Sequence, residues 1–229
     1  MHKRRMGKDI KKAVIVGGTG GLGSEIVKGL SECYSFDEKW LSTDRPDVMD
    51  KKAYDHISDS IDLAIYLAGI NVTKSIDDLT LDEVIDVYNV NIFGAFNFVK
   101  NLKEKMIGGY KPTFIFISSI MVNHPYPNRT AYASSKSAIE GFSNALSVEL
   151  GEDKISSVCL RLGHLNSLMK STVTNPQLLD NVKKKTPQGN LVDSAQFGSI
   201  IKNIHLTSEI FNGSVIDLDA GYTKNRWPL

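Results

Sequence analysis

Five glycines within seven residues directly follow a short apolar run, and this pattern restricts the fold more than any other in the chain. The run at residues 12–16 reads Lys-Ala-Val-Ile-Val, and the turn at 17–23 reads Gly-Gly-Thr-Gly-Gly-Leu-Gly. An amphipathic stretch then continues to Leu30, so we expect a strand, a turn and a helix in that order. Such a turn brings backbone N–H groups to a helix N-terminus, which suits the pyrophosphate of a dinucleotide. The alternative is an ordinary strand–helix turn.

Three of these glycines have distinct expected roles. Gly17 permits the tight turn, Gly21 lets the backbone approach a pyrophosphate, and Gly23 allows the helix to pack closely on the strand. The turn carries no charged side chain. The expected cofactor contacts in this segment are Gly17, Thr19, Gly20, Gly21, Leu22 and Gly23.

A carboxylate at the end of the next predicted strand indicates which dinucleotide is used. We expect this strand at residues 39–43, followed by Asp44 about 20 residues past the last glycine, where it can bind both adenosine ribose hydroxyls. The 2′-phosphate of NADP would place a like charge against it. Arg45 offers a partner for that phosphate, but it is one flexible cation beside a nearer carboxylate. We therefore predict NAD in preference to NADP, the alternative being that Asp44 is only a turn residue.

Apolar runs alternate with helical periods along the rest of the chain. This order predicts a doubly wound, mostly parallel α/β sheet of the Rossmann type in one domain, residues 13–229, after a basic and flexible extension at 1–12. A chain of 229 residues with 41% apolar content can bury one such core. The predicted strands are 47–50, 61–67, 113–117, 157–162 and 213–219, and the predicted helices are 51–60, 82–106, 131–150, 178–185 (a possible lid) and 193–205.

Composition excludes several classes of function. The net charge of +1 provides no field for nucleic acid, and the basic run Lys183–Lys185 fits a solvated helix face. Cys33 and Cys159 lie far apart in sequence and indicate neither a disulfide framework nor a metal site. No apolar run reaches the length of a membrane span, and no signal sequence is evident. We expect a soluble cytoplasmic protein that binds no nucleic acid, membrane or metal.

Tyr132 and Lys136 are the candidate acid–base pair. They lie four residues apart in the predicted helix 131–150, so they share one face. The pKa of a free tyrosine is about 10, and an ammonium about 4 Å away can stabilise the phenolate by on the order of 4 kcal/mol at an effective dielectric constant near 20. The spacing by itself also fits a solvated helix face.

Polar and small residues near other strand ends add to the candidate site. Ala68 and Gly69 close one strand and leave room for a flat ring, and Ser119 stands where another strand ends. Asn91 falls among the apolar positions of helix 82–106. It is either a satisfied core amide, which the spacing favours, or a site residue that bends the helix.

Together these segments resemble the short-chain dehydrogenase/reductase family, from Lys12 to Tyr222. The motifs agree in order, and Ser119 precedes Tyr132 by the 13 residues usual in that family. The matching positions are Gly17-x-x-x-Gly21-x-Gly23, Ala68-Gly69, Asn91, Ser119, Tyr132-x-x-x-Lys136, Leu162-Gly163 with Ser167 and Met169, Gly213–Ile216 and Asp219–Gly221.

The resemblance implies an oxidoreductase that moves hydride between a nicotinamide and a carbonyl or secondary alcohol. It implies that Tyr132 exchanges the proton and that Ser119 binds the substrate oxygen. It also implies that Lys136 lowers the pKa of the tyrosine and binds the nicotinamide ribose, and that Asn91 anchors a water. Further cofactor contacts implied by the resemblance are Ala68, Gly69, Tyr132, Lys136 and Gly163.

The expected partners are a small carbonyl or alcohol substrate and a second copy of the chain. Related proteins commonly pair through the helix that carries the tyrosine. Helix 131–150 has more apolar residues than one buried stripe requires, which favours a homodimer or homotetramer. These residues are Ile139, Phe142, Ala145, Leu146 and Leu150.

Four positions depart from the family pattern. Val16 stands in place of threonine, Tyr66 and Leu67 replace two asparagines, and Leu162 replaces a proline. None of these changes touches the four catalytic positions. Two alternatives remain open, namely a 3-oxoacyl-carrier-protein-type reductase that uses NADPH, and a nucleotide-sensing protein without catalysis.

Overall fold

Six parallel strands form one sheet in the order β2-β1-β3-β4-β5-β6. The computed structural model describes residues 10–36, 47–166 and 176–225. The prediction of a doubly wound parallel α/β sheet is confirmed. The strands are β1 (Lys11–Val16), β2 (Tyr34–Phe36), β3 (Leu63–Tyr66), β4 (Thr113–Ser119), β5 (Ser156–Leu162) and β6 (Val215–Leu218).

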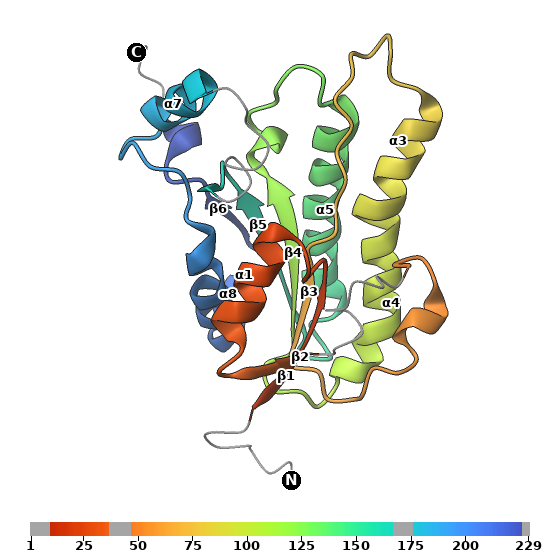
Figure 1. The fold of residues 1–229 in the computed structure, drawn as a ribbon. Coiled ribbons are helices and arrows are strands. Elements are labelled where there is room, and N and C mark those ends of the chain that lie inside the picture. Colours follow the sequence, from red (N-terminus) through yellow and green to blue (C-terminus); the bar gives the residue numbers. More distant parts are fainter. Residues whose placement is uncertain (1–9, 37–46, 167–175, 226–229) are drawn as a thin grey trace.

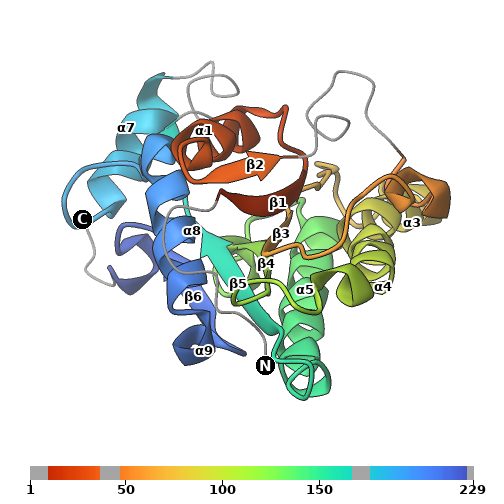
Figure 2. The same cartoon turned by 90° about the horizontal axis from the view of Figure 1, so that it is seen from below.

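Helices cover both faces of the sheet (Figures 1 and 2). One face carries α1 (Gly21–Leu30) and α8 (Phe197–Leu206). The opposite face carries α3 (Leu81–Tyr88), α4 (Gly94–Met106) and α5 (Thr130–Glu149). The helix α7 (Pro176–Lys185) lies beyond the carboxyl end of the sheet, and the short α9 (Ser208–Phe211) follows α8.

The strands are apolar at successive positions because both faces of the sheet are buried. In β1, Val14 and Val16 pack under α4 and α5, whereas Ala13 and Ile15 pack under α1 and α8. The same alternation occurs in the other central strands, which produces one core cluster on each side. Buried parallel strands therefore read as continuous apolar runs, which is why the sequence revealed them.

The segment predicted as one helix at 82–106 contains a π-helical turn, Asn89–Phe93, between α3 and α4. The start of α3 is fixed by local contacts, because Thr80 and Glu83 form a reciprocal capping box. A π turn within an α-helix is rare and commonly accompanies a functional site. Here it carries Asn91.

The region between β2 and β3 differs from the prediction. Residues 47–50 form a turn rather than a strand, because the Asp47 carboxylate accepts a hydrogen bond from Met49 N at 2.8 Å. Asp50 caps a single 3₁₀ turn, η1 (Lys51–Tyr54), where a helix at 51–60 was expected. The described strand β2 lies upstream of the predicted range 39–43, which is outside the described residues.

The folded domain also begins earlier in the chain than predicted. Lys11 and Lys12 belong to β1 and not to the predicted extension, because the backbone N–H of Lys12 donates to Asp62 Oδ2 at 2.8 Å and that of Lys11 donates to Cys33 O at 2.9 Å. Within the described part of the chain, no helix is long and apolar enough to cross a membrane.

Candidate active site

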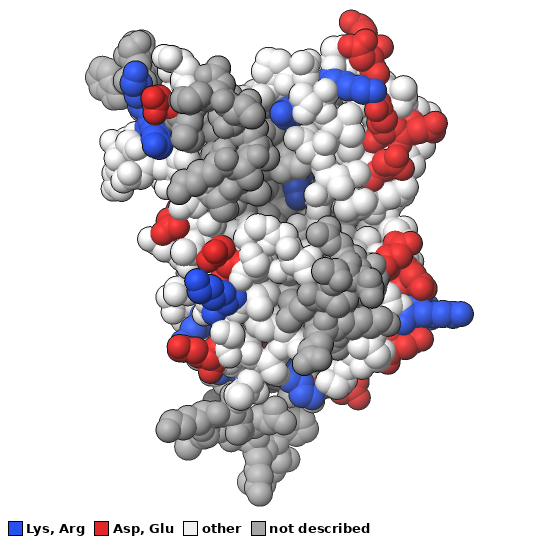
Figure 3. Space-filling view, viewed as in Figure 1, with Lys and Arg blue, Asp and Glu red and all other residues white. Residues whose placement is uncertain are grey.

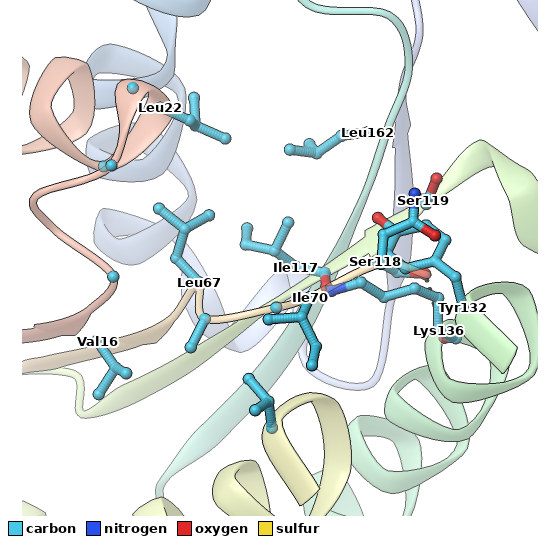
Figure 4. Close-up of a pocket in the computed structure, with 18 of the residues that line it drawn as sticks. Val16, Leu22, Leu67, Ile70, Ile117, Ser118, Ser119, Tyr132, Lys136 and Leu162 are labelled. Atoms are coloured by element: carbon cyan, nitrogen blue, oxygen red, sulfur yellow. Dashed lines mark hydrogen bonds between the residues drawn. The ribbon is translucent and has the colours of Figure 1, made fainter. Parts of the chain in front are cut away.

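A cavity of ≈ 520 Å³ opens at the carboxyl ends of the central strands. It brings together most of the residues predicted to form the site. In Figure 4, Ser119, Tyr132 and Lys136 lie at one end of this cavity, and Val16, Leu22 and Leu67 lie at the other. The predicted residues that line it are Gly17, Thr19, Gly20, Gly21, Leu22, Gly23, Ala68, Gly69, Ser119, Tyr132, Lys136 and Gly163.

The glycine turn has the geometry that its sequence predicts. Gly17 has a φ of +90°, which favours glycine, and a Cβ on Gly23 would overlap the carbonyl oxygen of Gly17. Nothing lies within 4 Å of the position where a Cβ on Gly21 would be. Because α1 begins at Gly21, the turn presents a helix N-terminus and free space to the cavity, and both features fit a pyrophosphate.

Ser119 and Tyr132 come from different elements and meet at the cavity wall. Ser119 ends β4, and Tyr132 lies in the first turn of α5. Burial raises the pKa of Tyr132, while a hydrogen bond from Ser119 and the charge of Arg129 act to lower it. The Ser119 hydroxyl also accepts a hydrogen bond from Met121 N at 3.2 Å, which holds it at the end of the strand.

Lys136 is buried between α5 and the sheet. Its Nζ donates to the carbonyl oxygen of Ile117 at 2.8 Å and lies 5.7 Å from the centroid of the Tyr132 ring. A Cβ on Gly69 would be 3.2 Å from the same Nζ, so the ammonium borders the nucleotide side of the cavity. Burial lowers the pKa of Lys136 to about 8. Whether Lys136 lowers the pKa of Tyr132, as the resemblance implies, stays a prediction.

Asn91 is a satisfied amide, the alternative that the spacing favoured, and it does not line the cavity, so its role as a site residue stays a prediction. Its amide is satisfied, because Oδ1 accepts from Ile70 N at 2.8 Å while Nδ2 donates to Ile70 O at 3.1 Å and to Ser135 Oγ at 2.8 Å. It also lies in the π turn. Ser135 in turn donates to the carbonyl of Tyr132 at 2.8 Å. Asn91 therefore connects the loop after β3 to the helix that carries the tyrosine.

One departure from the family pattern supports this arrangement. Tyr66 is buried at the end of β3, and its hydroxyl donates to the carbonyl of Val90 in the π turn at 2.5 Å. A Cβ on Gly94 would overlap this hydroxyl. The asparagine-to-tyrosine change thus places a hydrogen-bond donor under the π turn, and a glycine makes room for it.

A partly buried ion network beside Lys136 was not predicted from the sequence. Glu140, one helical turn further along α5, accepts hydrogen bonds from Ser118 Oγ at 2.6 Å and from Arg161 Nε and Nη2 at 2.9 and 2.7 Å. Arg161 also donates to Asp217 at 2.7 Å. These residues join α5 to β4, β5 and β6. No motif connects them in sequence, although a charged arginine inside an apolar strand was a usable signal.

A second missed group lies on the loops that follow β4, β5 and β6. The Tyr126 hydroxyl is 2.8 Å from His164 Nε2 and 2.7 Å from the Tyr222 hydroxyl. Burial and the charge of Lys185 both lower the pKa of His164. His164 directly follows Gly163, so this group stands behind the cavity wall and joins three loops.

Some predicted residues cannot be placed. Asp44, Arg45, Ser167 and Met169 lie outside the described residues. Across 10–36, 47–166 and 176–225, no three His, Cys, Asp or Glu side chains gather as metal ligands.

Comparisons with known proteins agree with this geometry. A family profile described as short chain dehydrogenase matches residues 43–178, more than half of the chain. A tropinone reductase homolog of Arabidopsis thaliana is 21% identical over 94% of this chain and 93% of that protein. A 3-oxoacyl-[acyl-carrier-protein] reductase of Chlamydia trachomatis is 24% identical over 92% of this chain and 96% of that protein.

Solved structures share the fold. A gluconate 5-dehydrogenase from Burkholderia cenocepacia, solved in complex with NADP and tartrate, aligns with a TM-score of 0.83 at 22% identity. The alignment covers 94% of this chain and 96% of that one.

Proposed function

The chain belongs to the short-chain dehydrogenase/reductase family, and from this premise we propose that it is an oxidoreductase in which Tyr132 is the acid–base group. One observation carries the proposal. Ser119 from β4 and the pair Tyr132 and Lys136 from α5 line the same cavity as the glycine turn between β1 and α1. This arrangement supports the proposal of a proton donor, a hydrogen-bond donor and an ammonium beside a dinucleotide.

Each residue has a role that its position supports. A bound nicotinamide would supply the hydride chemistry. Ser119 donates to the oxygen of the carbonyl or alcohol substrate and keeps it within reach of Tyr132. Tyr132 gives its proton to that oxygen in reduction and takes it back in oxidation. Lys136 binds the nicotinamide ribose and favours the phenolate by its charge. Asn91 holds the loop after β3 against α5.

We propose NAD rather than NADP as the cofactor, on the strength of the Asp44 carboxylate. The gluconate 5-dehydrogenase that shares the fold was solved with NADP, so the fold itself does not exclude that cofactor. Arg45 next to Asp44 is the residue that would favour a 2′-phosphate. The preference for NAD or NADP depends on the side chains of Asp44 and Arg45. Measuring the affinity of the protein for each of the two cofactors tests it.

A 3-oxoacyl-carrier-protein-type reductase is the second candidate. The similarity to the Chlamydia trachomatis enzyme over nearly the full length of both chains favours it. A nucleotide-sensing protein without catalysis is less well supported, because the three side chains that a reductase needs all face the cavity.

We also propose that two copies of the chain pair, with α4 contributing to the interface. Of the apolar residues expected on α5, Ile139, Leu146 and Leu150 are buried inside their own subunit, whereas Phe142 is half-buried and Ala145 is exposed, so α5 keeps part of its expected apolar face. Phe93 at the start of α4 and Phe96 within it are also about half exposed, 47% and 55%. An exposed pair of phenylalanines indicates a surface that a second copy of the chain covers. The few, unpaired cysteines fit a cytoplasmic location.

Purified protein mixed with NADH or NADPH and a panel of ketones and 3-oxoacyl thioesters tests the proposed function. We expect cofactor oxidation at 340 nm with at least one substrate class and a stronger response to NADH. Cofactor binding without turnover across the panel would instead support the sensing protein.

A further inference from the structure

We propose that the substrate carries an anionic group of the carboxylate type and that Arg129 binds it at the rim of the cavity. The inference rests on the proposed function, since it names the class of carbonyl compound that the same site accepts. It depends on a cation that the protein places beside Tyr132 and does not neutralise.

Arg129 bridges two segments, the loop after β3 and the start of α5, that each contribute residues to the cavity wall. It directly precedes α5, three residues before Tyr132, and its Nη1 donates to the Thr73 hydroxyl and to the carbonyl of Asn128. Thr73 is on the loop after β3, two residues beyond Asn71, which lines the cavity. The guanidinium thus connects the loop after β3 to the start of α5.

The charge of Arg129 has no acidic partner among the described residues. No described carboxylate lies within 4.0 Å of it, and its hydrogen bonds to described residues all leave from Nη1. Its Nε is buried and has no hydrogen-bond partner there. Arg161 shows what this chain does with an arginine that serves the fold, because Glu140 and Asp217 neutralise it fully. A partly desolvated guanidinium without a counter-ion is costly unless a ligand supplies one.

The charge is close enough to influence the reacting group. It acts to lower the pKa of Tyr132, which lines the cavity. Figure 3 shows the acidic surface gathered over α3, whereas basic surface is visible inside the central hollow. Lys136 lines the cavity and Arg129 acts on Tyr132 in its wall, so the field there favours a negatively charged substrate.

The geometry also limits where the anionic group lies on the substrate. Arg129 and Tyr132 are separated by three residues, about 5 Å along a helix. A carboxylate held by the guanidinium while the carbonyl faces Tyr132 is therefore only a few bonds from the reacting carbon. A planar guanidinium matches a planar carboxylate, and its charge is permanent at every working pH.

Matched pairs of neutral and anionic substrates test the proposal. The probes are oxo acids with the ketone two, three or four carbons from the carboxylate, each with its methyl ester. The variants are Arg129→Met, which removes the charge, and Arg129→Lys, which retains it. Thr73→Val serves as the control, because it removes the hydrogen bond between the two walls and keeps the cation.

We expect the wild-type kcat/KM to be at least about 10-fold higher for the best acid than for its ester. Arg129→Met should remove this advantage, because it should lower kcat/KM for the acid by at least about 10-fold more than for the ester, and Arg129→Lys should restore part of it. Thr73→Val should preserve the preference for the acid. An equal loss on acid and ester in Arg129→Met, or a wild-type preference for the ester, would overturn the inference.

A binding measurement separates this inference from the proposed function. Calorimetric titration of the same oxo acids into the protein with NADH reports on Arg129 even when no substrate turns over. Acid binding that disappears in Arg129→Met, without turnover in the wild type, supports the anion site and contradicts the proposed function. Absence of acid binding in the wild type contradicts the anion site.

Discussion

The Tyr66 hydroxyl donates a hydrogen bond to the carbonyl oxygen of Val90 across 2.5 Å, and this contact joins the end of β3 to the π-helical turn. Val90 lines the cavity, and Tyr66 ends the strand that leads to it. The next residue after Val90 is Asn91, whose side chain holds Ile70 and Ser135. The tyrosine therefore supports the residue that aligns the loop after β3 with α5.

Tyr66→Phe tests this support. The substitution keeps the ring in the core and leaves the Val90 carbonyl without its donor, which should lower the free energy of unfolding by about 1 to 3 kcal/mol and reduce turnover. Tyr34→Phe is the matched control, because Tyr34 makes a buried hydrogen bond to His205 at 2.6 Å away from the cavity. Chemical denaturation and steady-state rates are the measurements. Equal turnover losses in both variants would show that Tyr66 contributes only stability.

Tyr132→Phe removes only the proton-transfer hydroxyl. Turnover should fall by about 100-fold or more, with the fold and the dissociation constant for NADH nearly unchanged. Tyr110→Phe provides a control, since Tyr110 is an exposed tyrosine that does not line the cavity. Near wild-type turnover in Tyr132→Phe would disprove the assignment of the acid–base group.

Lys136→Met should stabilise the protein in the absence of cofactor and weaken cofactor binding. The pKa of Lys136 falls from 10.5 to about 8 on burial. The buried ammonium therefore costs stability at pH 7, and its removal should raise the free energy of unfolding by about 1 to 3 kcal/mol. Thermal unfolding and NADH titration measure the two effects, and a less stable variant would contradict the first of them.

The lowered pKa of Lys136 also determines how the stability of the unmodified protein depends on pH. Between pH 8 and 10.5 the folded state binds fewer protons at Lys136 than the unfolded state does, so this group makes stability rise with pH across that window. Cofactor affinity should fall above pH 8, because a neutral amine binds the ribose less well. Both trends should be absent in Lys136→Met.

Asp44→Ala should relax the preference for NAD, because it removes the like charge that opposes a 2′-phosphate. Arg45→Ala should leave NAD use nearly intact. Titration of NADH and NADPH into the three proteins gives the dissociation constants. Tighter binding of NADPH than NADH by the unmodified protein would contradict the predicted preference.

Phe96→Glu should convert the assembled protein to a 25.3 kDa monomer, because it places a charge on the exposed apolar surface of α4. Light scattering at micromolar concentration measures the mass. Ile210→Glu is the control, since Ile210 is an apolar residue on α9 that is 79% exposed. A monomeric unmodified protein would refute the predicted assembly.

The sequence by itself determined the type of fold and most of the cavity. Strands buried on both faces read as apolar runs, and a glycine turn between a strand and a helix has few other uses. Local periodicity therefore predicted β1, β3, β4 and β5, and short-range spacing predicted that Tyr132 and Lys136 share a helix face. Such features depend on neighbouring residues, which is why they can be read without the fold.

Only the tertiary structure decided the contacts between distant segments. The hydrogen bond from Tyr66 to Val90, the ion pairs of Arg161 and the hydrogen bond from Arg129 to Thr73 join residues that no local pattern connects. Buried polar groups must find partners wherever the chain brings them together. The π turn also depends on a distant contact, because the carbonyl of Val90 in this turn accepts a hydrogen bond from Tyr66 in β3. A periodic apolar pattern predicts a helix at this place, but it does not predict that hydrogen bond.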